Sequence, residues 1–167
     1  MARKIDRNSF DNVSALLDAT NLDILRLLFD EPRLAMSELA RRIGMSAPAV
    51  TERVQRMQDA GVIRGARLDV DHAALGLRIT AFVRVRPMPG QLQNVSELAR
   101  KTPEIVECHR VTGEDCFIMK VLVGRVELLE AVLDEILKYG NTTSSIVQST
   151  PVPARAPPLP GTVRRGS

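Results

Sequence analysis

The sequence predicts an α+β fold in two parts: three short helices, followed by a unit in which strands and helices follow the order β-α-β-β-α-β. Two observations predict it. Up to residue 60, apolar residues recur three and four positions apart, the period of a helix with one buried face. From residue 79 onward, short strand-like apolar runs alternate with two further helical patterns. The expected segments are an N-terminal arm (1–16), a helical domain (17–65), a hinge (66–78), an α+β domain (79–150) and a Pro-rich tail, extended or disordered (151–167).

Composition narrows the class of protein. Of the 167 residues, 44% are apolar and 26% are charged, the balance of a globular protein with a packed core. Aromatic residues make up 3% and Trp is absent, so recognition by stacking nucleic-acid bases on aromatic rings is not expected. The formal charge of +3 is compatible with phosphate binding, but it argues for it only if the basic residues cluster.

No export signal or membrane segment is expected. The N-terminal residues lack the apolar core of a signal peptide, and no later apolar run is long enough to cross a bilayer. We therefore expect a cytoplasmic protein, associated with the nucleoid if it binds DNA. In the reducing cytoplasm, Cys108 and Cys116 are expected to be small core residues rather than a disulfide.

Capping residues mark three helices in the first part. Thr20 and Asp23 have the spacing of a capping box, so the first helix is expected from Thr20. Ser37 is expected to cap a second, short helix that ends at Gly44. Ser46 is expected to cap the third, which continues to residue 60. The residues expected to face the core from this third helix are Val50, Val54 and Met57.

Residues 37–60 have the three parts of a helix-turn-helix: a short helix, a tight Gly turn, and a second helix whose outer face can enter the major groove of DNA. A single unit of this kind makes few contacts with DNA. We therefore expect a dimer that presents two such helices about one DNA turn, roughly 34 Å, apart or a multiple of it.

The outward residues of the second helix are the candidate DNA contacts. Residues near its N-terminal half are expected to reach base edges, whereas arginines around it are expected to contact phosphates. The alternative is a three-helix cap with solvated arginines that binds no DNA. The candidates are Pro48, Thr51, Glu52 and Gln55 for bases, Ser46 and Ala47 for further DNA contacts at the helix start, and Arg41, Arg42, Arg53, Arg56 and Arg64 for phosphates.

After the third helix, residues 62–69 are expected to form a brief strand or wing, and residues 71–76 a linker with a helical turn. The order of the remaining elements is that of the ferredoxin-like fold, a four-stranded antiparallel sheet with both helices on one face. Both alternating sets of strand residues contain apolar side chains, so a partner subunit is expected to cover the second face. The expected elements are strands at 79–85, 105–111, 116–123 and 142–148, and helices at 91–101 and 126–139.

The run SELARRIGMSAPAVTERVQRMQDAGVIRG, at 37–65, resembles the helix-turn-helix of the leucine-responsive regulatory protein and AsnC family, the feast/famine transcription regulators. The run IVECHRVTGEDCFIMKVLV, at 105–123, resembles the effector-binding domain of that family. The resemblance extends over roughly residues 17–150. It implies a helix-turn-helix, winged or plain, and a hinge strand. It also implies a ferredoxin-like domain that dimerises through its sheet and builds octamers or other rings.

The resemblance also implies an amino-acid effector bound between dimers, which shifts the population of assemblies and so the DNA affinity. The effector loop of the family corresponds to Thr112, Gly113, Glu114, Asp115 and Cys116, although many members have an acidic residue in place of Cys116. From the residues alone, the backbone at Gly113 can approach a ligand closely, and the two carboxylates can bind an ammonium group. An ordinary hairpin turn is the alternative. Weaker candidates are Ser144 and Ser145.

Two other functions are possible alternatives. A metal or thiol sensor would use Cys108, His109 and Cys116, but Cys108 and His109 are neighbours in a strand and point to opposite faces. An enzyme would need a nucleophile, a base and an orienting group together, and no such set or phosphate loop is recognisable. We therefore expect a DNA-binding regulator without catalytic residues, metal or cofactor, with duplex DNA, an amino acid and copies of itself as partners.

Overall fold

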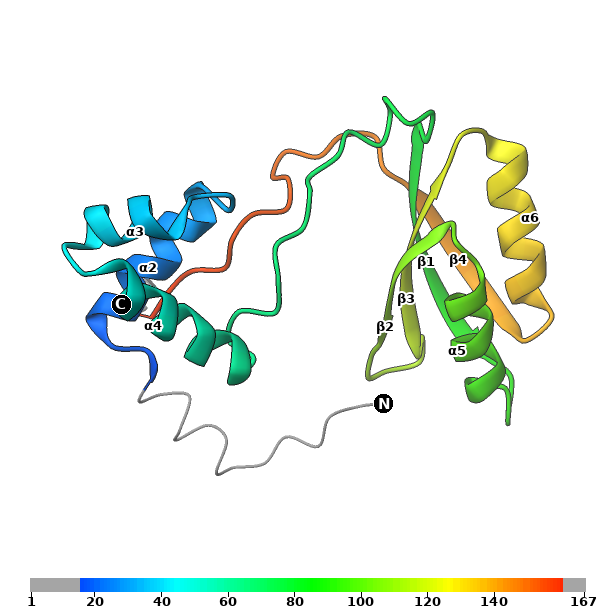
Figure 1. The fold of residues 1–167 in the computed structure, drawn as a ribbon. Helices are drawn as coiled ribbons and strands as arrows, with labels where there is room; N and C mark the ends of the chain where they lie inside the picture. The colour runs from blue at the N-terminus through cyan, green and yellow to red at the C-terminus, as the bar shows by residue number, and fades with distance from the viewer. Residues whose placement is uncertain (1–15, 161–167) are drawn as a thin grey trace, which may run out of the picture. The chain divides into compact units, whose positions relative to one another are not determined.

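The computed structural model describes residues 16–160. It divides into two compact units, one made of residues up to Leu68 together with those from Ala154, and the other of Asp69–Pro153. Figure 1 shows the helical unit and the sheet unit with the two chain segments that connect them. The arm expected at 1–16 lies outside the described residues except for Leu16, and the tail lies outside them from residue 161 onward.

The first unit contains the three expected helices, α2 (Ala19–Asp30), α3 (Met36–Ile43) and α4 (Ala47–Asp59). Their apolar faces meet in one core, in which the predicted inward residues of α4 are buried, as expected from their spacing. The buried residues of this core are Ile24, Leu25, Leu39, Ala40, Val50, Val54 and Met57.

Two of the predicted helix caps are wrong and two are confirmed. Asp18, not Thr20, caps α2, because its carboxylate accepts a hydrogen bond of 2.7 Å from the backbone N–H of Asn21. Ala35 precedes α3, so Ser37 lies inside the helix instead of capping it. Gly44 ends α3 with φ +74°, and the Ser46 hydroxyl accepts the N–H of Ala49 at 3.4 Å at the start of α4.

The segment between the units has no strand. Residues 62–71, expected to contain a wing or hinge strand, lack regular secondary structure. A strand requires a neighbouring backbone for its hydrogen bonds, and no strand in the described chain pairs with this segment. The expected turn further along is present, because the His72 carbonyl accepts hydrogen bonds from the N–H groups of Leu75 and Leu77.

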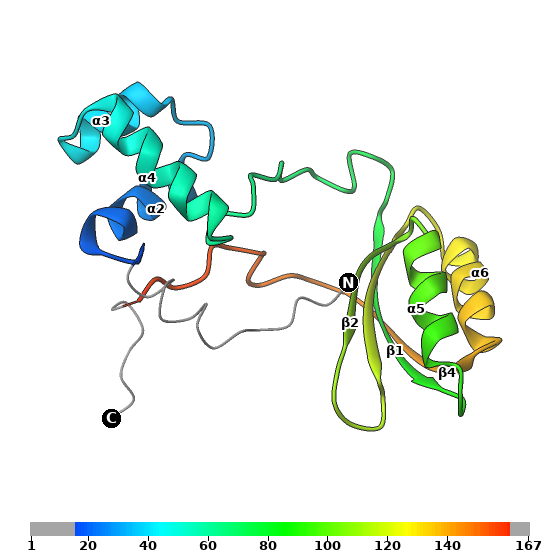
Figure 2. The ribbon, with the colours of Figure 1, turned by 60° about the horizontal axis from the view of Figure 1, so that its bottom comes forward.

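The second unit has the predicted β-α-β-β-α-β order, and its sheet is antiparallel with the strand order β2-β3-β1-β4. Figures 1 and 2 show both helices on the same face of the sheet, as the ferredoxin-like arrangement requires. The elements are β1 (Ile79–Pro87), α5 (Leu92–Lys101), β2 (Ile105–Arg110), β3 (Phe117–Val123), α6 (Val126–Leu137) and β4 (Gly140–Ile146).

The β4 strand starts two residues earlier than expected. Gly140 pairs with Pro87, and a Cβ atom at Gly140 would lie 2.5 Å from the carbonyl oxygen of Arg86. Only glycine permits this close approach of the two strands. The glycine therefore begins the strand, although glycine in a sequence usually indicates a turn.

The two faces of the sheet differ in burial. Alternate residues of β1, such as Ala81, Val83 and Val85, are buried against α5 and α6. Phe82 and Arg84 point to the opposite face, and the Phe82 side chain is 44% exposed. The Phe82 side chain is thus a large aromatic group on the open face of the sheet in the described chain.

Candidate nucleic-acid interface and ligand loop

The structure brings the predicted base-contacting residues together on the outer face of α4. A shallow depression there is lined by Ala47, Pro48, Thr51, Glu52, Gln55 and Arg56. Ser46 stands at the N-terminus of the same helix as its cap. Because Val50, Val54 and Met57 anchor the opposite face in the core, the outer face is held rigidly and points away from the unit.

Some polar groups on this face are satisfied within the helix. The Thr51 hydroxyl donates a hydrogen bond of 2.8 Å to the carbonyl of Ala47, and the Gln55 amide donates one of 2.9 Å to the Asp59 carboxylate. Arg56 has no ion-pair partner in the part of the chain that the structure describes. Arg56 therefore keeps all its donors for an external anion such as a phosphate.

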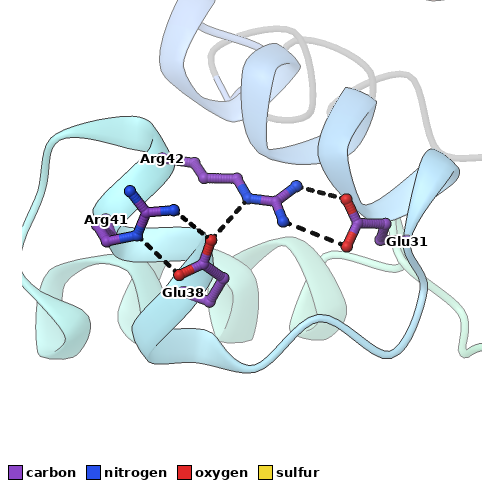
Figure 3. Close-up of polar contacts among 4 residues, drawn as sticks. All are labelled: Glu31, Glu38, Arg41 and Arg42. Carbon is purple, nitrogen blue, oxygen red and sulfur yellow. Dashed lines mark hydrogen bonds and ion pairs between the residues drawn. The ribbon is translucent and has the colours of Figure 1, made fainter.

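Arg41 and Arg42 lie in an ion-pair network that joins α3 to the end of α2 (Figure 3). The Arg41 Nε donates to Glu38 at 2.8 Å and the Arg42 Nε donates to Glu38 at 2.9 Å. Arg42 also bonds Glu31 through its two terminal nitrogens. The hydrogen bonds that Glu38 accepts, from Arg41 first and then from Arg42, lower the pKa of its carboxyl to about 2.

The two arginines of this network differ in exposure. The Arg42 side chain is 33% exposed and has a carboxylate on each side, whereas the Arg41 side chain is 73% exposed with one carboxylate partner. Arg42 thus positions α3 against the residue that follows α2. Arg41 retains donors that face solvent.

Arg53 also has protein partners. Its guanidinium donates to the Asp18 carboxylate at 2.8 Å and to the side-chain oxygen of Asn21 at 3.1 Å. Asn21 is buried, and its amide donates to the carbonyl of Leu16. The hydrogen bond from Arg53 lowers the pKa of the Asp18 carboxyl. Arg53 therefore fixes the N-terminus of α2 to α4, a contact that sequence spacing alone does not reveal.

The predicted ligand loop connects β2 to β3 and is closed by a hydrogen bond of 2.9 Å from the N–H of Val111 to the carbonyl of Cys116. Gly113 has φ +114°, which side chains other than glycine rarely allow. Nothing lies within 4 Å of the position a Cβ would take there, so the loop is open at this residue.

The two carboxylates of the loop face arginines of β1 that the sequence analysis missed. Glu114 pairs with Arg86, while Asp115 lies 3.5 Å from Arg84 and 3.8 Å from Arg86. The missed signal is the alternation of arginines with buried valines along β1. A ligand ammonium at this loop must therefore compete with two guanidinium groups, whereas a ligand carboxylate would find them within reach.

Ser144 and Ser145 do not join the loop within one chain. They lie in the middle of β4, where Ser145 pairs with Phe82 and Ser144 with Val83. The loop leads into Phe117, whose partner in β1 is Val85. Adjacent residues of a strand also point to opposite faces, so at most one of the two serines faces the open side of the sheet.

Cys108 and His109 are adjacent in β2 and so point to opposite faces of the sheet. Cys108 pairs with Met119 and His109 with Ile118. Cys108, expected in the core, is exposed at the surface, and Cys116 is half-buried. The partial burial of the Cys108 thiol raises its pKa. Among the described residues, no group of three or more His, Cys, Asp or Glu side chains is placed to hold a metal ion. The helices of residues 16–160 also include none long and apolar enough to cross a membrane.

A helix-turn-helix with a polar, exposed second helix, linked to a separate β-α-β-β-α-β unit, is the architecture of a two-domain DNA-binding protein. Residues 17–64 match a winged helix-turn-helix DNA-binding domain, and residues 80–157 match the Lrp/AsnC ligand binding domain. The chain belongs to the Lrp/AsnC family of transcription regulators, not to a family of enzymes.

Relatives and solved structures agree with this assignment. The transcriptional regulator LrpB of Bacillus subtilis is 34% identical over 125 residues, which cover 75% of this chain and 84% of that protein. The structure of LrpC from Bacillus subtilis has a TM-score of 0.77 at 30% identity, over 80% of this chain and 96% of that chain. The feast or famine regulatory protein of M. tuberculosis, complexed with L-methionine, has a TM-score of 0.80 at 31% identity, over 86% and 99%.

Proposed function

We propose that this regulator reads duplex DNA with the outer face of α4 and that a free amino acid controls its assembly and DNA affinity. The observation that carries the proposal is the exposed depression that gathers the candidate base contacts on one helix. The proposed action takes place in the cytoplasm on chromosomal DNA, and no metal or other cofactor is part of it.

On DNA, Pro48, Thr51, Glu52 and Gln55 contact base edges, with Ser46 and Ala47 at the helix start against the backbone. Arg56 and Arg64 bind phosphates, because both are exposed and neither has an ion-pair partner in residues 16–160. Arg41 adds a phosphate contact through its solvent-facing donors. Arg42 and Arg53 act mainly by holding the three helices in place for these contacts.

The effector binds at the loop of residues 112–116. The L-methionine complex of the M. tuberculosis relative supports an amino acid as the ligand class. In this chain the carboxylate of the amino acid would pair with Arg84 or Arg86, displacing Asp115 or Glu114, and the freed carboxylate would accept the ammonium group. Ser144 or Ser145 of a second subunit would add a hydroxyl contact.

Assembly is the link between ligand and DNA. Two chains pair through the open sheet face that carries Phe82, and dimers associate further into octamers or related rings. The effector binds one assembly more tightly than another and shifts the population toward it. The shift changes the spacing of the α4 helices available to DNA.

Fluorescence anisotropy of labelled DNA from the protein's own upstream region tests the proposal, at two salt concentrations and with a panel of amino acids. The reading-face variant is Gln55→Ala, and the matched control is Gln58→Ala, the same substitution one turn further along α4 and outside the depression. We expect Q55A to weaken binding about tenfold, since a base contact is worth about 1–3 kcal/mol, and Q58A to bind normally.

Binding that weakens steeply with salt and responds to one amino acid would support both halves of the proposal. Binding unaffected by every amino acid would remove the proposed effector class but keep the DNA-reading role. Equal binding by Q55A, Q58A and the parent protein would contradict the assignment of the outer face of α4.

A further inference from the structure

The tail from Ala154 to Pro160 belongs to the helix-turn-helix unit, although the sequence predicts an extended or disordered segment. Leu159 is partly buried and packs against the core of α2, α3 and α4. In Figure 1 the red end of the described chain lies beside α2 and α4. The described part of the tail has no helix or strand.

The tail lies over an apolar groove of the helical unit. The groove encloses a cavity of about 510 Å³. One wall comes from Phe29 of α2, Met36 of α3 and Val54 of α4, and the segment after α4 adds Ile63. Pro157, Leu159 and Pro160 form the other wall. Phe29, a large apolar side chain at the surface of α2, thus lines the same cavity as the tail residues.

The composition of the tail suits docking. Residues 151–160 contain five prolines, which fix φ and keep the chain extended before it binds. A chain that is already extended loses little conformational entropy when a groove immobilises it. One apolar side chain, that of Leu159, then supplies the anchor.

We propose that residues 154–160 are a docking segment for the groove of the same chain and form a second connection between the DNA-binding unit and the ligand-binding unit. The groove shares no residue with the reading face, because α4 contributes Val54 and Gln58 to the groove, whereas the reading face consists of Ala47, Pro48, Thr51, Glu52, Gln55 and Arg56. The tail is therefore a tether and not a cover for the recognition helix. Among the proposed phosphate contacts, Arg64 lines the groove.

The second connection is also the shorter one. Between the packed Ile63 and the start of β1, the chain has residues 64–78, which reach at most about 50 Å when fully extended. Between the end of β4 and Pro157 it has residues 147–156, which reach about 35 Å at most. A docked tail therefore lowers the limit on how far the two units of one chain can separate.

Tryptophan fluorescence tests the docking directly, because the natural chain contains no Trp and a single Tyr. In the full-length protein, Leu159→Trp places the probe in the groove, which has room for an indole. Val152→Trp is the matched control, since Val152 lies earlier in the tail and is 61% exposed. We expect the L159W protein to emit at shorter wavelength than the V152W protein and to be quenched severalfold less by acrylamide. Equal quenching of the two variants would overturn the proposal.

A second variant shows which chain provides the groove. Adding Phe29→Ala to Leu159→Trp removes one wall, so the protection of the indole from acrylamide should be lost. This double variant is then refolded with an excess of a chain that ends at Pro153, which offers an intact and empty groove. Protection that stays lost supports docking within one chain. If the protection returns, the tail docks on a neighbouring chain, and this result would overturn the proposal. Neither readout involves DNA or effector, so the result is independent of the proposed function.

Discussion

Arg53 and Arg56 are three residues apart on α4 and have different roles in the structure. Arg53 is bonded to Asp18 and to the buried Asn21, whereas Arg56 lines the reading face without an ion-pair partner in the described residues. From the sequence both are basic residues of a recognition helix. Their roles separate only when α2 is placed against α4, because the partners of Arg53 are more than thirty positions away in the chain.

Arg53→Met is expected to destabilise the helical unit by about 1 kcal/mol, because it leaves the buried oxygen of Asn21 without its donor. Arg56→Met is the matched control, with unchanged stability but weaker, less salt-dependent DNA binding. Urea unfolding followed by circular dichroism, together with DNA titration, measures both. Equal loss of stability in the two variants would show that the bond from Arg53 to Asn21 contributes nothing.

Glu38 gives a pH dependence at the residue scale. Its pKa of about 2 in the folded state is below the ordinary value of 4.5. The ionised carboxylate therefore stabilises the folded unit above pH 4.5, and this contribution is lost as the pH falls toward 2. Glu38→Gln should flatten acid unfolding over that range, and high salt should reduce the difference because the ion pairs are exposed. Identical acid unfolding curves for the Glu38→Gln variant and the parent protein at low salt would contradict this role of Glu38.

At the scale of elements, periodicity located the helices and strands but not all of their ends. The apolar spacing of α4 and the alternation in β1 come from burial, which the sequence records directly. The sequence does not record the helix caps in the same direct way. Asp18 and Thr20 are both residue types that cap helices well, and which of them caps α2 depends on where Arg53 holds the chain. The hinge strand expected before residue 78 is absent because a strand needs a partner that this segment lacks in the described chain.

The start of β4 supplies a test at this scale. Gly140→Ala is expected to cost about 2–3 kcal/mol, because its Cβ would overlap the backbone at Arg86. Gly90→Ala has open space but φ +81°, and its cost should be about 1 kcal/mol from backbone strain alone. Thermal unfolding of the two variants compares overlap with strain. A smaller loss for G140A than for G90A would mean that β1 and β4 separate easily.

At the scale of the whole molecule, the open sheet face determines how copies associate under the proposed function. Phe82→Glu should prevent dimers, and DNA affinity and its salt dependence should both fall as one of two helix-turn-helix units is lost. Leu128→Glu is the control, since Leu128 is similarly exposed on α6, on the other side of the sheet. Sedimentation velocity measures the mass. If the F82E protein is still a dimer, the interface between subunits does not lie on the face that carries Phe82.

The candidate site shows where sequence reasoning ends. Residues of the reading face share one helix, so their spacing alone groups them, and the structure places them together. The ligand loop is predicted as a loop, but its arginine partners come from β1, which pairs with β3 only in the folded sheet. Groups from one element are thus predictable, and groups from several are not.

The helical unit is built from the two ends of the chain, and this has a consequence for its synthesis. Leu159 is made after the entire sheet unit, roughly 5 to 20 seconds after Leu68 at ribosomal rates of about 5–20 residues per second. Throughout that interval the newly made helices expose the apolar groove to the cell. The DNA-binding unit thus begins to emerge from the ribosome before the sheet unit and is completed after it.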